Sequence, residues 1–455
     1  MAKIMKIKKF SIILIAFTLF FGLLISQINT TTYISKENGK KSVNSNLSIS
    51  NNAGCEWNRT WDGYQQDTVL DIKVDSSNNI YVTGASNFNT VGWWVSFFLL
   101  KYNSSGDLQW NRTWAVTGDT IGSGIAFDSL NNIYVVGTSF PLMGSMPIIL
   151  LKYNSEGVLD WYRQYVIGDD SHGAGIAIDS SDNIYLTGYD AIGGNQDILL
   201  VKCNSSGFIE WSRTWGGAGM DVSYRIALDS SNNIYLAGTT DYYGGNSDIC
   251  LVKYDSFGTK EWHRTRDVGN FDISWNVALD SSENIFLTGN VGNWGNIDAV
   301  LIKFNSDGQH QWNQTWGGSG NDICWGLEID SSDDIYIGGT IDMIGGPFQF
   351  IMFGDITLVK YDNSGQYLWN YTRRVAHQEG CHSIALDSSE ENIYLAGSSD
   401  EFGTNDTLVV KYNLKEPISD GNGEQAIPGY NTVLIIAINC CIIVYFIKKR
   451  RKEKE

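Results

Sequence analysis

Four short runs of strand-forming residues follow one another in residues 226–265: Ile226-Ala-Leu-Asp229, Asn233-Ile-Tyr-Leu-Ala-Gly238, Asp248-Ile-Cys-Leu-Val-Lys-Tyr254 and Lys260-Glu-Trp-His-Arg-Thr265. Ser, Asn, Asp and Gly residues lie between the runs, and these residues favour tight turns. The second and third runs are apolar on both of their alternating sets of positions, which is typical of strands covered on both faces. The stretch therefore predicts one four-stranded antiparallel sheet packed between neighbours.

This unit occurs seven times, at intervals of about 50 residues. An Asp ends the first run of each unit, and a Lys lies near the end of the third. These residues are Asp75, Asp128, Asp179, Asp229, Asp280, Asp330 and Asp387, and Lys101, Lys152, Lys202, Lys253, Lys303, Lys360 and Lys411. Periods of about 40–50 residues with several short strands are typical of sheets repeated around an axis. We therefore predict an all-β fold, a seven-bladed β-propeller of four-stranded antiparallel blades, over residues 55–413.

The order of the runs at the two ends predicts how the ring closes. The first recognisable run is Glu56-Trp-Asn-Arg-Thr-Trp61, a fourth run without the three that should precede it. The last unit stops after its third run, at Asn413. We therefore expect the N-terminal strand to complete the final blade, because closing the ring removes the open edges that sheets otherwise expose.

Motifs in the sixth unit resemble a known family. They are Gly317-Gly-Ser-Gly-Asn-Asp322, then Ile329-Asp-Ser-Ser-Asp-Asp-Ile-Tyr336, and later Asp355-Ile-Thr-Leu-Val-Lys-Tyr361. This pattern looks like the SBBP (seven-bladed β-propeller) repeat of exported prokaryotic surface proteins, and the resemblance covers residues 55–413. It implies the propeller fold and export from the cell, but that family has no common catalytic chemistry to carry over to this chain.

The segments outside the repeats predict export and anchoring. Residues 1–30 hold four Lys before an apolar run, so they are interpreted as a signal peptide or an uncleaved signal anchor. Residues 431–447 are predicted as the core of a transmembrane helix, and the span is expected to begin near residue 426. A helix of the about 22 residues from 426 to 447 is roughly 33 Å long, which is enough to cross a bilayer. Residues 31–54 and 414–430 are linkers, and 448–455 form a basic cytoplasmic tail. We expect an extracellular propeller anchored in the cell membrane by the C-terminal helix. If the N-terminal segment is not cleaved, it forms a second membrane span.

The charge of the repeat region argues against some classes of partner, and its cysteine content bears on disulfide bonding. The two ends hold ten of the 32 basic residues and two of the 50 acidic ones, which leaves 22 basic against 48 acidic residues between them. Such a surface repels nucleic acid and anionic lipid headgroups. Five of the seven Cys lie in the repeats, an odd number that predicts no obvious disulfide framework. Sequons such as the one at Asn103 suggest a glycosylated surface.

Three loops between second and third runs depart from the repeat, in the first, second and sixth units. The loop of the sixth unit is long, from Ile341 to Phe353, and the other two carry large apolar residues. In a closed ring these loops lie along one arc, and an exposed apolar patch commonly marks an interface. The alternative is that the side chains fold back over the blades. The candidate partner-binding residues are Trp93, Trp94, Phe97, Phe98, Met143, Met146, Phe348, Phe350 and Phe353.

Acidic residues suggest a second kind of site. In five units an acidic residue lies eight positions before the repeat Asp, and further Asp residues open the third run. Clustered carboxylates are ligands for Ca²⁺, so a metal at the mouth of the channel is one hypothesis. The other is that each acid caps backbone N–H groups of its own loop. The candidate metal ligands are Asp67, Asp221, Asp272, Asp322 and Glu379, and no other cofactor is predicted.

The Trp and Arg residues that recur in the fourth runs are interpreted as contacts between blades, because a residue repeated in most blades is usually structural. The five His do not form a metal-binding spacing, and no catalytic residues are predicted. The sequence therefore favours a cell-surface propeller that binds a protein or a glycan. The alternatives are an extracellular hydrolase or quinone-dependent oxidoreductase with its site in the channel, and a structural component of the envelope.

Overall fold

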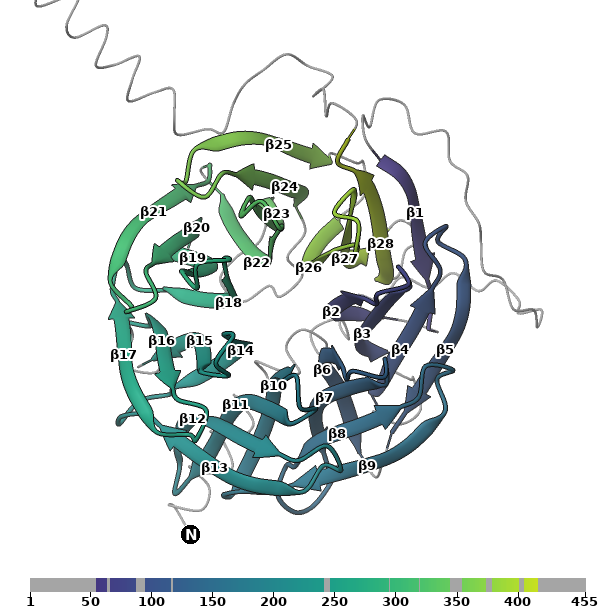
Figure 1. The fold of residues 1–455 in the computed structure, drawn as a ribbon, viewed down its shortest axis with the longest axis vertical. Coiled ribbons are helices and arrows are strands. Elements are labelled where there is room, and N and C mark those ends of the chain that lie inside the picture. Colours follow the sequence, from purple (N-terminus) through teal and green to yellow (C-terminus); the bar gives the residue numbers. More distant parts are fainter. Residues whose placement is uncertain are drawn as a thin grey trace, which may run out of the picture.

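The computed structural model describes residues 55–415 except 64–65, 87–94, 116–117, 241–245, 294, 319, 344–353, 374–378 and 401–404. Within this part of the chain, seven four-stranded antiparallel sheets stand around a central axis (Figure 1). The predicted fold class of the repeat region is confirmed. The predicted signal segment and transmembrane helix lie outside the described residues. No helix among the described residues has the length and apolar character to span a membrane.

Each blade runs from an inner strand beside the axis to an outer strand at the rim (Figure 1). The strands are, for blade 1, β2 (Thr68–Val74), β3 (Ile80–Ser86), β4 (Ser96–Tyr102) and β5 (Leu108–Trp114); for blade 2, β6 (Asp119–Phe127), β7 (Ile133–Phe140), β8 (Ile148–Tyr153) and β9 (Leu159–Tyr165); for blade 3, β10 (Asp170–Ile178), β11 (Ile184–Ile192), β12 (Asn195–Cys203) and β13 (Ile209–Trp215); for blade 4, β14 (Val222–Leu228), β15 (Ile234–Thr240), β16 (Asp248–Tyr254) and β17 (Lys260–Arg266); for blade 5, β18 (Ile273–Leu279), β19 (Ile285–Asn293), β20 (Asn296–Phe304) and β21 (His310–Trp316); for blade 6, β22 (Asn321–Ile329), β23 (Ile335–Met343), β24 (Asp355–Tyr361) and β25 (Tyr367–Arg373); and for blade 7, β26 (Glu379–Leu386), β27 (Asn392–Ser399), β28 (Asp406–Asn413) and β1 (Cys55–Trp61).

Strand β1 closes the ring, as the order of the runs predicts. It pairs antiparallel with β28, with Asn58 opposite Val410 and Trp61 opposite Thr407. In Figure 1 the purple β1 lies beside the yellow-green β28, so the two ends of the repeat region meet in one blade. The edge of β28 is thereby covered.

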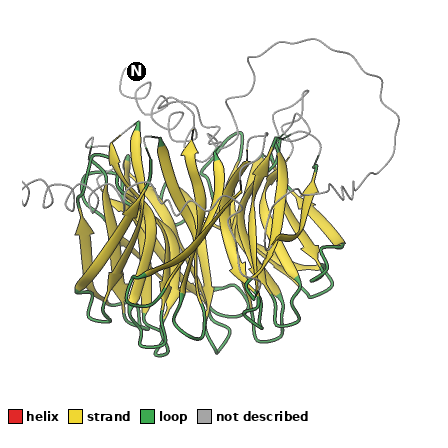
Figure 2. Cartoon of the chain, turned by 90° about the horizontal axis from the view of Figure 1, so that it is seen from above, coloured by secondary structure: helices red, strands yellow, loops and turns green. Residues whose placement is uncertain are grey.

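The strands connect at two opposite ends of the ring (Figure 2). The turns from first to second strand and from third to fourth strand lie at one end, which we call the turn face. The connections from second to third strand, and from each outer strand to the next inner strand, lie at the other end, which we call the mouth face. This arrangement follows from the antiparallel pairing of all four strands in every blade.

The repeat Asp builds the first turn of each blade. In blade 1, Asp75 Oδ1 accepts hydrogen bonds from the backbone N–H groups of Ser77 at 2.9 Å and Asn79 at 2.8 Å. Asn78 between them has a φ of 61°, a left-handed conformation that Asn tolerates well. The Tyr81 hydroxyl donates to Asp75 Oδ2 at 3.1 Å. The most regular acidic residue of the repeat is therefore a turn former.

The hydrophobic core lies between blades. Seven buried clusters each draw residues from two adjacent blades; one joins Val82 and Leu100 of blade 1 to Tyr394 and Val409 of blade 7. Because both faces of the middle strands are covered in this way, their sequences lack the alternation of a half-exposed sheet.

The repeated Trp and Arg residues join blade to blade, as predicted from their recurrence. Gly157, in the outer turn of blade 2, has a φ of +73°, and a Cβ on it would lie 2.8 Å from the indole of Trp110 in blade 1. Arg112 Nε of the same outer strand donates to the Gly157 carbonyl at 2.6 Å. The indole, the guanidinium and the glycine turn therefore interlock, and equivalent contacts follow around the ring.

Candidate functional site

Every inner strand carries a β-bulge at the same point. In blade 4, for example, the pairing of β14 with β15 shifts between Ser223 and Arg225 and leaves Tyr224 out of register. The sequence predicted an inner strand over only residues 226–229, whereas β14 begins at Val222 because pairing resumes before the bulge. A bulge re-aims a side chain and is common next to functional sites. The bulge residues are Leu70, Ser123, Ala174, Tyr224, Trp275, Trp325 and His382.

All seven bulge residues line one cavity of about 150 Å³ in the central channel. Those of blades 1 to 3 have small or aliphatic side chains, whereas those of blades 4 to 7 are aromatic. Ring centroids of Tyr224 and Trp275 lie 4.5 Å apart, those of Trp275 and Trp325 6.4 Å, and those of Trp325 and His382 5.2 Å. A ring of nearly equivalent blades thus encloses a pocket with one aromatic wall, which we call the aromatic arc.

The remaining lining comes from the beginning of the inner strands and from the second strands, toward the mouth face. His172 of β10 stacks on Tyr189 with ring centroids 4.2 Å apart, and Phe140 lies 5.5 Å from the His172 ring. Ile121, Met220 and Val222 complete the lining on this side. The pocket is therefore mostly apolar and aromatic, with few polar groups, which is the usual character of a small-ligand or side-chain pocket.

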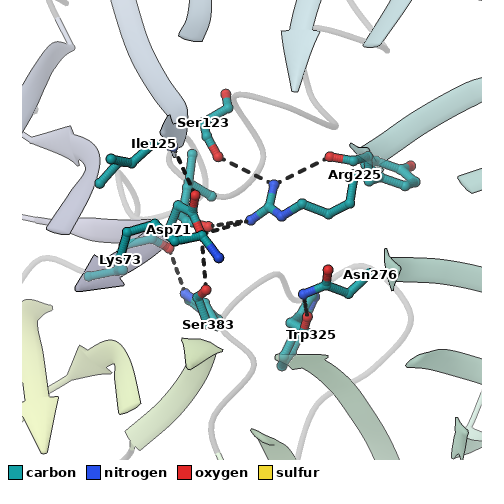
Figure 3. Close-up of polar contacts among 12 residues, drawn as sticks. Asp71, Lys73, Ser123, Ile125, Arg225, Asn276, Trp325 and Ser383 are labelled. Carbon is teal, nitrogen blue, oxygen red and sulfur yellow. Dashed lines mark hydrogen bonds and ion pairs between the residues drawn. The ribbon is translucent and has the colours of Figure 1, made fainter. Parts of the chain in front are cut away.

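Arg225 forms the floor of the pocket (Figure 3). Its guanidinium crosses the channel and donates to the carbonyl of Leu70 at 2.9 Å. It also donates to the carbonyls of Ser123, Ala174 and Tyr224 at 3.3, 3.2 and 3.3 Å. All four carbonyls belong to bulge residues, whose backbone groups are displaced from the sheet ladder. One side chain of blade 4 therefore satisfies backbone groups of blades 1 to 4.

Asp71 balances the charge of this guanidinium. Its carboxylate lies 3.5 Å from Arg225 and accepts hydrogen bonds from the Ile125 N–H and the Ser383 hydroxyl at 2.9 and 3.1 Å. Closer to the turn face, Lys73 Nζ lies 3.3 Å from Glu328 Oε1, an ion pair between the inner strands of blades 1 and 6. These charged groups pair with one another, so their arrangement supports a closed channel floor.

The pocket offers little acid–base chemistry at neutral pH. Burial lowers the pKa of His172 to about 3, so its imidazole is neutral. Its Nδ1 is buried without a hydrogen-bond partner among the described residues. Burial also lowers the pKa of His382, and its Nδ1 lies 2.9 Å from the Val69 carbonyl. Neutral imidazoles suit hydrogen bonding to a ligand better than proton transfer near pH 7.

His172 should make stability depend on pH. Its folded pKa of about 3 lies below the unfolded value, so its contribution is present above about pH 6.5 and is lost as the pH falls toward 3. At pH 5 the expected loss is about 2 kcal/mol. We expect His172→Phe to reduce the fall in unfolding free energy between pH 7 and pH 5 by this amount in urea titrations. The exposed His263→Phe is the control; equal pH dependence of both variants would contradict the assignment.

The structure corrects part of the predicted loop site. Phe97 and Phe98 lie in β4 with 0 % exposure, because strand β4 begins at Ser96 and places both rings in the interblade cores. Met143 is 92 % exposed in the loop of blade 2, and Met146 is half-buried against a small cluster that includes Phe140. The remaining predicted partner-binding residues lie outside the described residues: Trp93, Trp94, Phe348, Phe350 and Phe353.

The five predicted metal ligands are not brought together. Each lies at a different boundary between blades, and all are 0–2 % exposed: Asp67, Asp221, Asp272, Asp322 and Glu379. The Gly217 N–H donates to Asp221 at 2.7 Å and the Gly318 N–H to Asp322 at 2.8 Å, four positions earlier in each case. This is the loop-capping alternative. Among the described residues only Asp67 belongs to a group of three carboxylates, with Asp62 and Asp406, whereas Asp221 and Asp322 each lie near one other carboxylate, those of Asp197 and Asp298.

The aromatic arc was not predicted from the sequence, although the sequence contains a signal for it. The bulge residues lie five positions before each repeat Asp, where the other blades carry Leu, Ser or Ala. Four consecutive blades have Tyr224, Trp275, Trp325 and His382 at this position. Departure from a repeat at one fixed position, in adjacent blades, indicates a shared location in the ring.

The fold and the pocket together define the class of this protein, a closed seven-bladed β-propeller with an asymmetric central pocket. Residues 115–139 match the family model of the SBBP beta-propeller repeat, so the predicted resemblance is confirmed and the chain contains an SBBP-type repeat. No curated protein matches the chain significantly.

Several solved structures are similar in fold. One is described as YCF48 bound to D1 peptide, with 12 % identity, coverage of 81 % of this chain and 99 % of that chain, and a TM-score of 0.47. A gluconolactonase from Xanthomonas campestris has 9 % identity, 72 % and 94 % coverage and a TM-score of 0.38. Chaetomium thermophilum Sqt1 has 10 % identity, 80 % and 98 % coverage and a TM-score of 0.47. These similarities are too weak to transfer a ligand or an activity.

Proposed function

We propose that this propeller is a binding module that takes an apolar or aromatic side chain of a protein partner into its channel pocket. The observation that carries the proposal is the aromatic arc: four non-repeated rings gathered by backbone bulges around one cavity of about 150 Å³. That volume suits one large side chain rather than an extended ligand. Aromatic anchors in desolvated pockets commonly carry most of the binding energy of an interface.

The polar groups of the pocket support binding rather than catalysis. Arg225 and Asp71 bond to each other and to backbone groups of the channel floor. His172 Nδ1 is a buried group that can bond to a peptide amide or carbonyl of the partner. A sugar ring stacked on the aromatic arc is the second candidate ligand, and few polar groups are present to bond its hydroxyls.

The location of the protein is also part of the proposal. The apolar segment after the N-terminal Lys residues and the apolar segment before the C-terminal basic cluster support a propeller held on the outside of a membrane. A net charge near −26 between these segments supports solubility there and favours a partner with basic residues around its anchor.

Substitution in the aromatic arc tests the proposal. We expect Trp325→Ala to weaken peptide binding about 30-fold, because truncating an anchor-binding ring costs about 2 kcal/mol. The probes are a displayed peptide library and a glycan array, each screened with the wild type and the variant. Met143→Ser, in the exposed loop of blade 2, is the matched control and should bind like the wild type.

The pattern of selected ligands decides between the candidates. Peptides enriched in aromatic or large aliphatic residues, lost with Trp325→Ala, would support the proposal. Selection of glycans instead, lost with Trp325→Ala, would show that the pocket binds a sugar rather than a side chain of a protein. Binding that is lost with Met143→Ser but kept with Trp325→Ala would place the partner on the loop of blade 2 and refute the pocket.

A further inference from the structure

Three carboxylates meet at the boundary where the ring closes. Asp62 directly follows β1, Asp67 directly precedes β2, and Asp406 opens β28. One ligand oxygen from each lies within 4.8 Å of the other two. Asp62 is exposed, whereas Asp67 and Asp406 are 0 % and 3 % exposed. We call this group the seam cluster; it joins the closing strand to blades 7 and 1.

The buried carboxylate of Asp67 has fewer hydrogen bonds than its two oxygens can accept. Its Oδ2 accepts a hydrogen bond from the Gly63 N–H at 2.7 Å. Its Oδ1 is also buried and accepts no backbone N–H or hydrogen bond of regular geometry among the described residues, although the Ser86 side chain lies beside it. Burial, with a smaller contribution from the carboxylates of Asp406 and Asp62, raises the pKa of Asp67 to about 7, although hydrogen bonds from the Ser86 side chain and the Gly63 N–H act to lower it. An unpaired buried carboxylate oxygen beside two other carboxylates is a costly arrangement unless a cation is present.

The equivalent residue at another boundary is fully satisfied. Asp272, between blades 4 and 5, accepts hydrogen bonds from the N–H groups of Val268 and Gly269 on Oδ2 and from the Gly292 N–H on Oδ1. Loop capping therefore uses both oxygens there. The same position at the closing seam has a backbone N–H on only one oxygen, so backbone capping does not account for both oxygens of Asp67.

At a third boundary between blades, the buried acidic residue forms an ion pair with an arginine. Between blades 6 and 7, Arg373 contacts Glu379 with two hydrogen bonds of 2.8 and 3.1 Å, and both side chains are buried. Arg373 ends its outer strand at the position that Trp61 occupies at the closing seam. The guanidinium found at one boundary is thus replaced by an indole at the other.

We propose that Asp62, Asp67 and Asp406 bind a Ca²⁺ ion that fastens the closing strand β1 to blades 7 and 1. The separation of the oxygens fits this ion. Ca²⁺–oxygen distances of about 2.3–2.6 Å place ligands on opposite sides of the ion about 4.6–5.2 Å apart. The site is separate from the channel pocket, so it stands independently of the proposed binding function.

Calcium titration of the full-length chain tests this site. The protein, purified in mild detergent and treated with a chelator, is titrated with CaCl₂ in a calorimeter and followed by thermal unfolding. At a Ca²⁺ concentration 100-fold above Kd, Tm should rise by about 4 °C. Tb³⁺ provides a direct probe, because Trp61 lies next to Asp62 and should sensitise its luminescence. Ca²⁺ should then displace Tb³⁺.

Three variants make the result specific to the seam cluster. Asp62→Asn should abolish both the Tm rise and the Tb³⁺ signal. Asp67→Asn should also abolish them, yet be at least as stable as the wild type in chelator, because it removes the buried charge. Asp267→Asn, at the matching position beside the satisfied Asp272, should respond like the wild type. No Ca²⁺ response in the wild type, or a response that persists in Asp62→Asn and Asp67→Asn, would overturn the proposal.

Discussion

A chain that starts at Asp62, without β1, is expected to lose cooperative unfolding. Strand β1 covers the edge of β28, and its Trp57 and Trp61 pack against Tyr394 of blade 7 and Phe98 of blade 1 at centroid distances of 5.9 and 5.1 Å. Both indoles are partly buried, so the loss of each costs less than the about 3–5 kcal/mol of a fully buried aromatic side chain. The two losses, with the strand pairing, approach the whole stability of a typical domain, about 5–15 kcal/mol.

A permuted chain separates the role of the strand from its position in the sequence. Blade 1 joins its third and fourth strands through Asn103-Ser-Ser-Gly-Asp107. A chain of residues 62–413 followed by Ser-Ser-Gly-Asp and then residues 55–61 would give blade 7 the same connection, because Tyr412 already lies opposite Cys55. We expect the permuted chain to unfold cooperatively by circular dichroism and calorimetry. Equal Tm values for the truncated and complete chains would refute the closure role of β1.

Replacing Arg225 by Leu is expected to destabilise the propeller by about 3 kcal/mol. The substitution leaves the buried Asp71 carboxylate without its counter-charge and removes the donors to four bulge carbonyls. Breaking one partner of a buried pair is costly because the remaining charge stays desolvated. Urea unfolding monitored by tryptophan fluorescence measures the difference in unfolding free energy.

Two comparisons identify the source of that loss. Arg213→Leu, at an exposed position on the rim, removes hydrogen bonds to the Gly258 and Ser212 carbonyls and a contact with the Trp211 ring but leaves no buried charge, and should cost about 1 kcal/mol. Asp71→Asn combined with Arg225→Leu should cost clearly less than the sum of the single substitutions, because the neutral Asn leaves no buried charge. A small effect of Arg225→Leu, similar to that of Arg213→Leu, would show that the crossing guanidinium does not hold the channel together.

The architecture could be predicted because it depends on contacts between residues close in sequence, and these contacts recur in every blade. Asp75 and its equivalents form turns from side-chain oxygens to N–H groups only two and four residues away. Trp110 is equally regular, since each blade meets the next in the same way. The offset between the run Glu56–Trp61 and the incomplete last unit predicted the closing strand, and the pairing of β1 with β28 confirms it.

The candidate sites were predicted less well, for reasons visible in single residues. Phe97 and Phe98 departed from the repeat, but a departure in sequence does not tell whether a side chain is buried, and both rings are core residues. Asp67 was one of five equivalent acids in the sequence, and the two carboxylates near it, Asp62 and Asp406, come from opposite ends of the repeat region. Their meeting depends on ring closure.

The sequence alone determined the number of blades, the turns and the closing strand, because these rest on contacts between neighbours in the chain or on contacts repeated identically around the ring. Only the tertiary structure decided the channel. The bulges aim Leu70, Tyr224, Trp275 and Trp325 at one cavity, and Arg225 reaches backbone groups up to 155 positions away. These contacts do not recur from repeat to repeat, so the sequence pattern does not reveal them. They form only because all seven inner strands face a common axis.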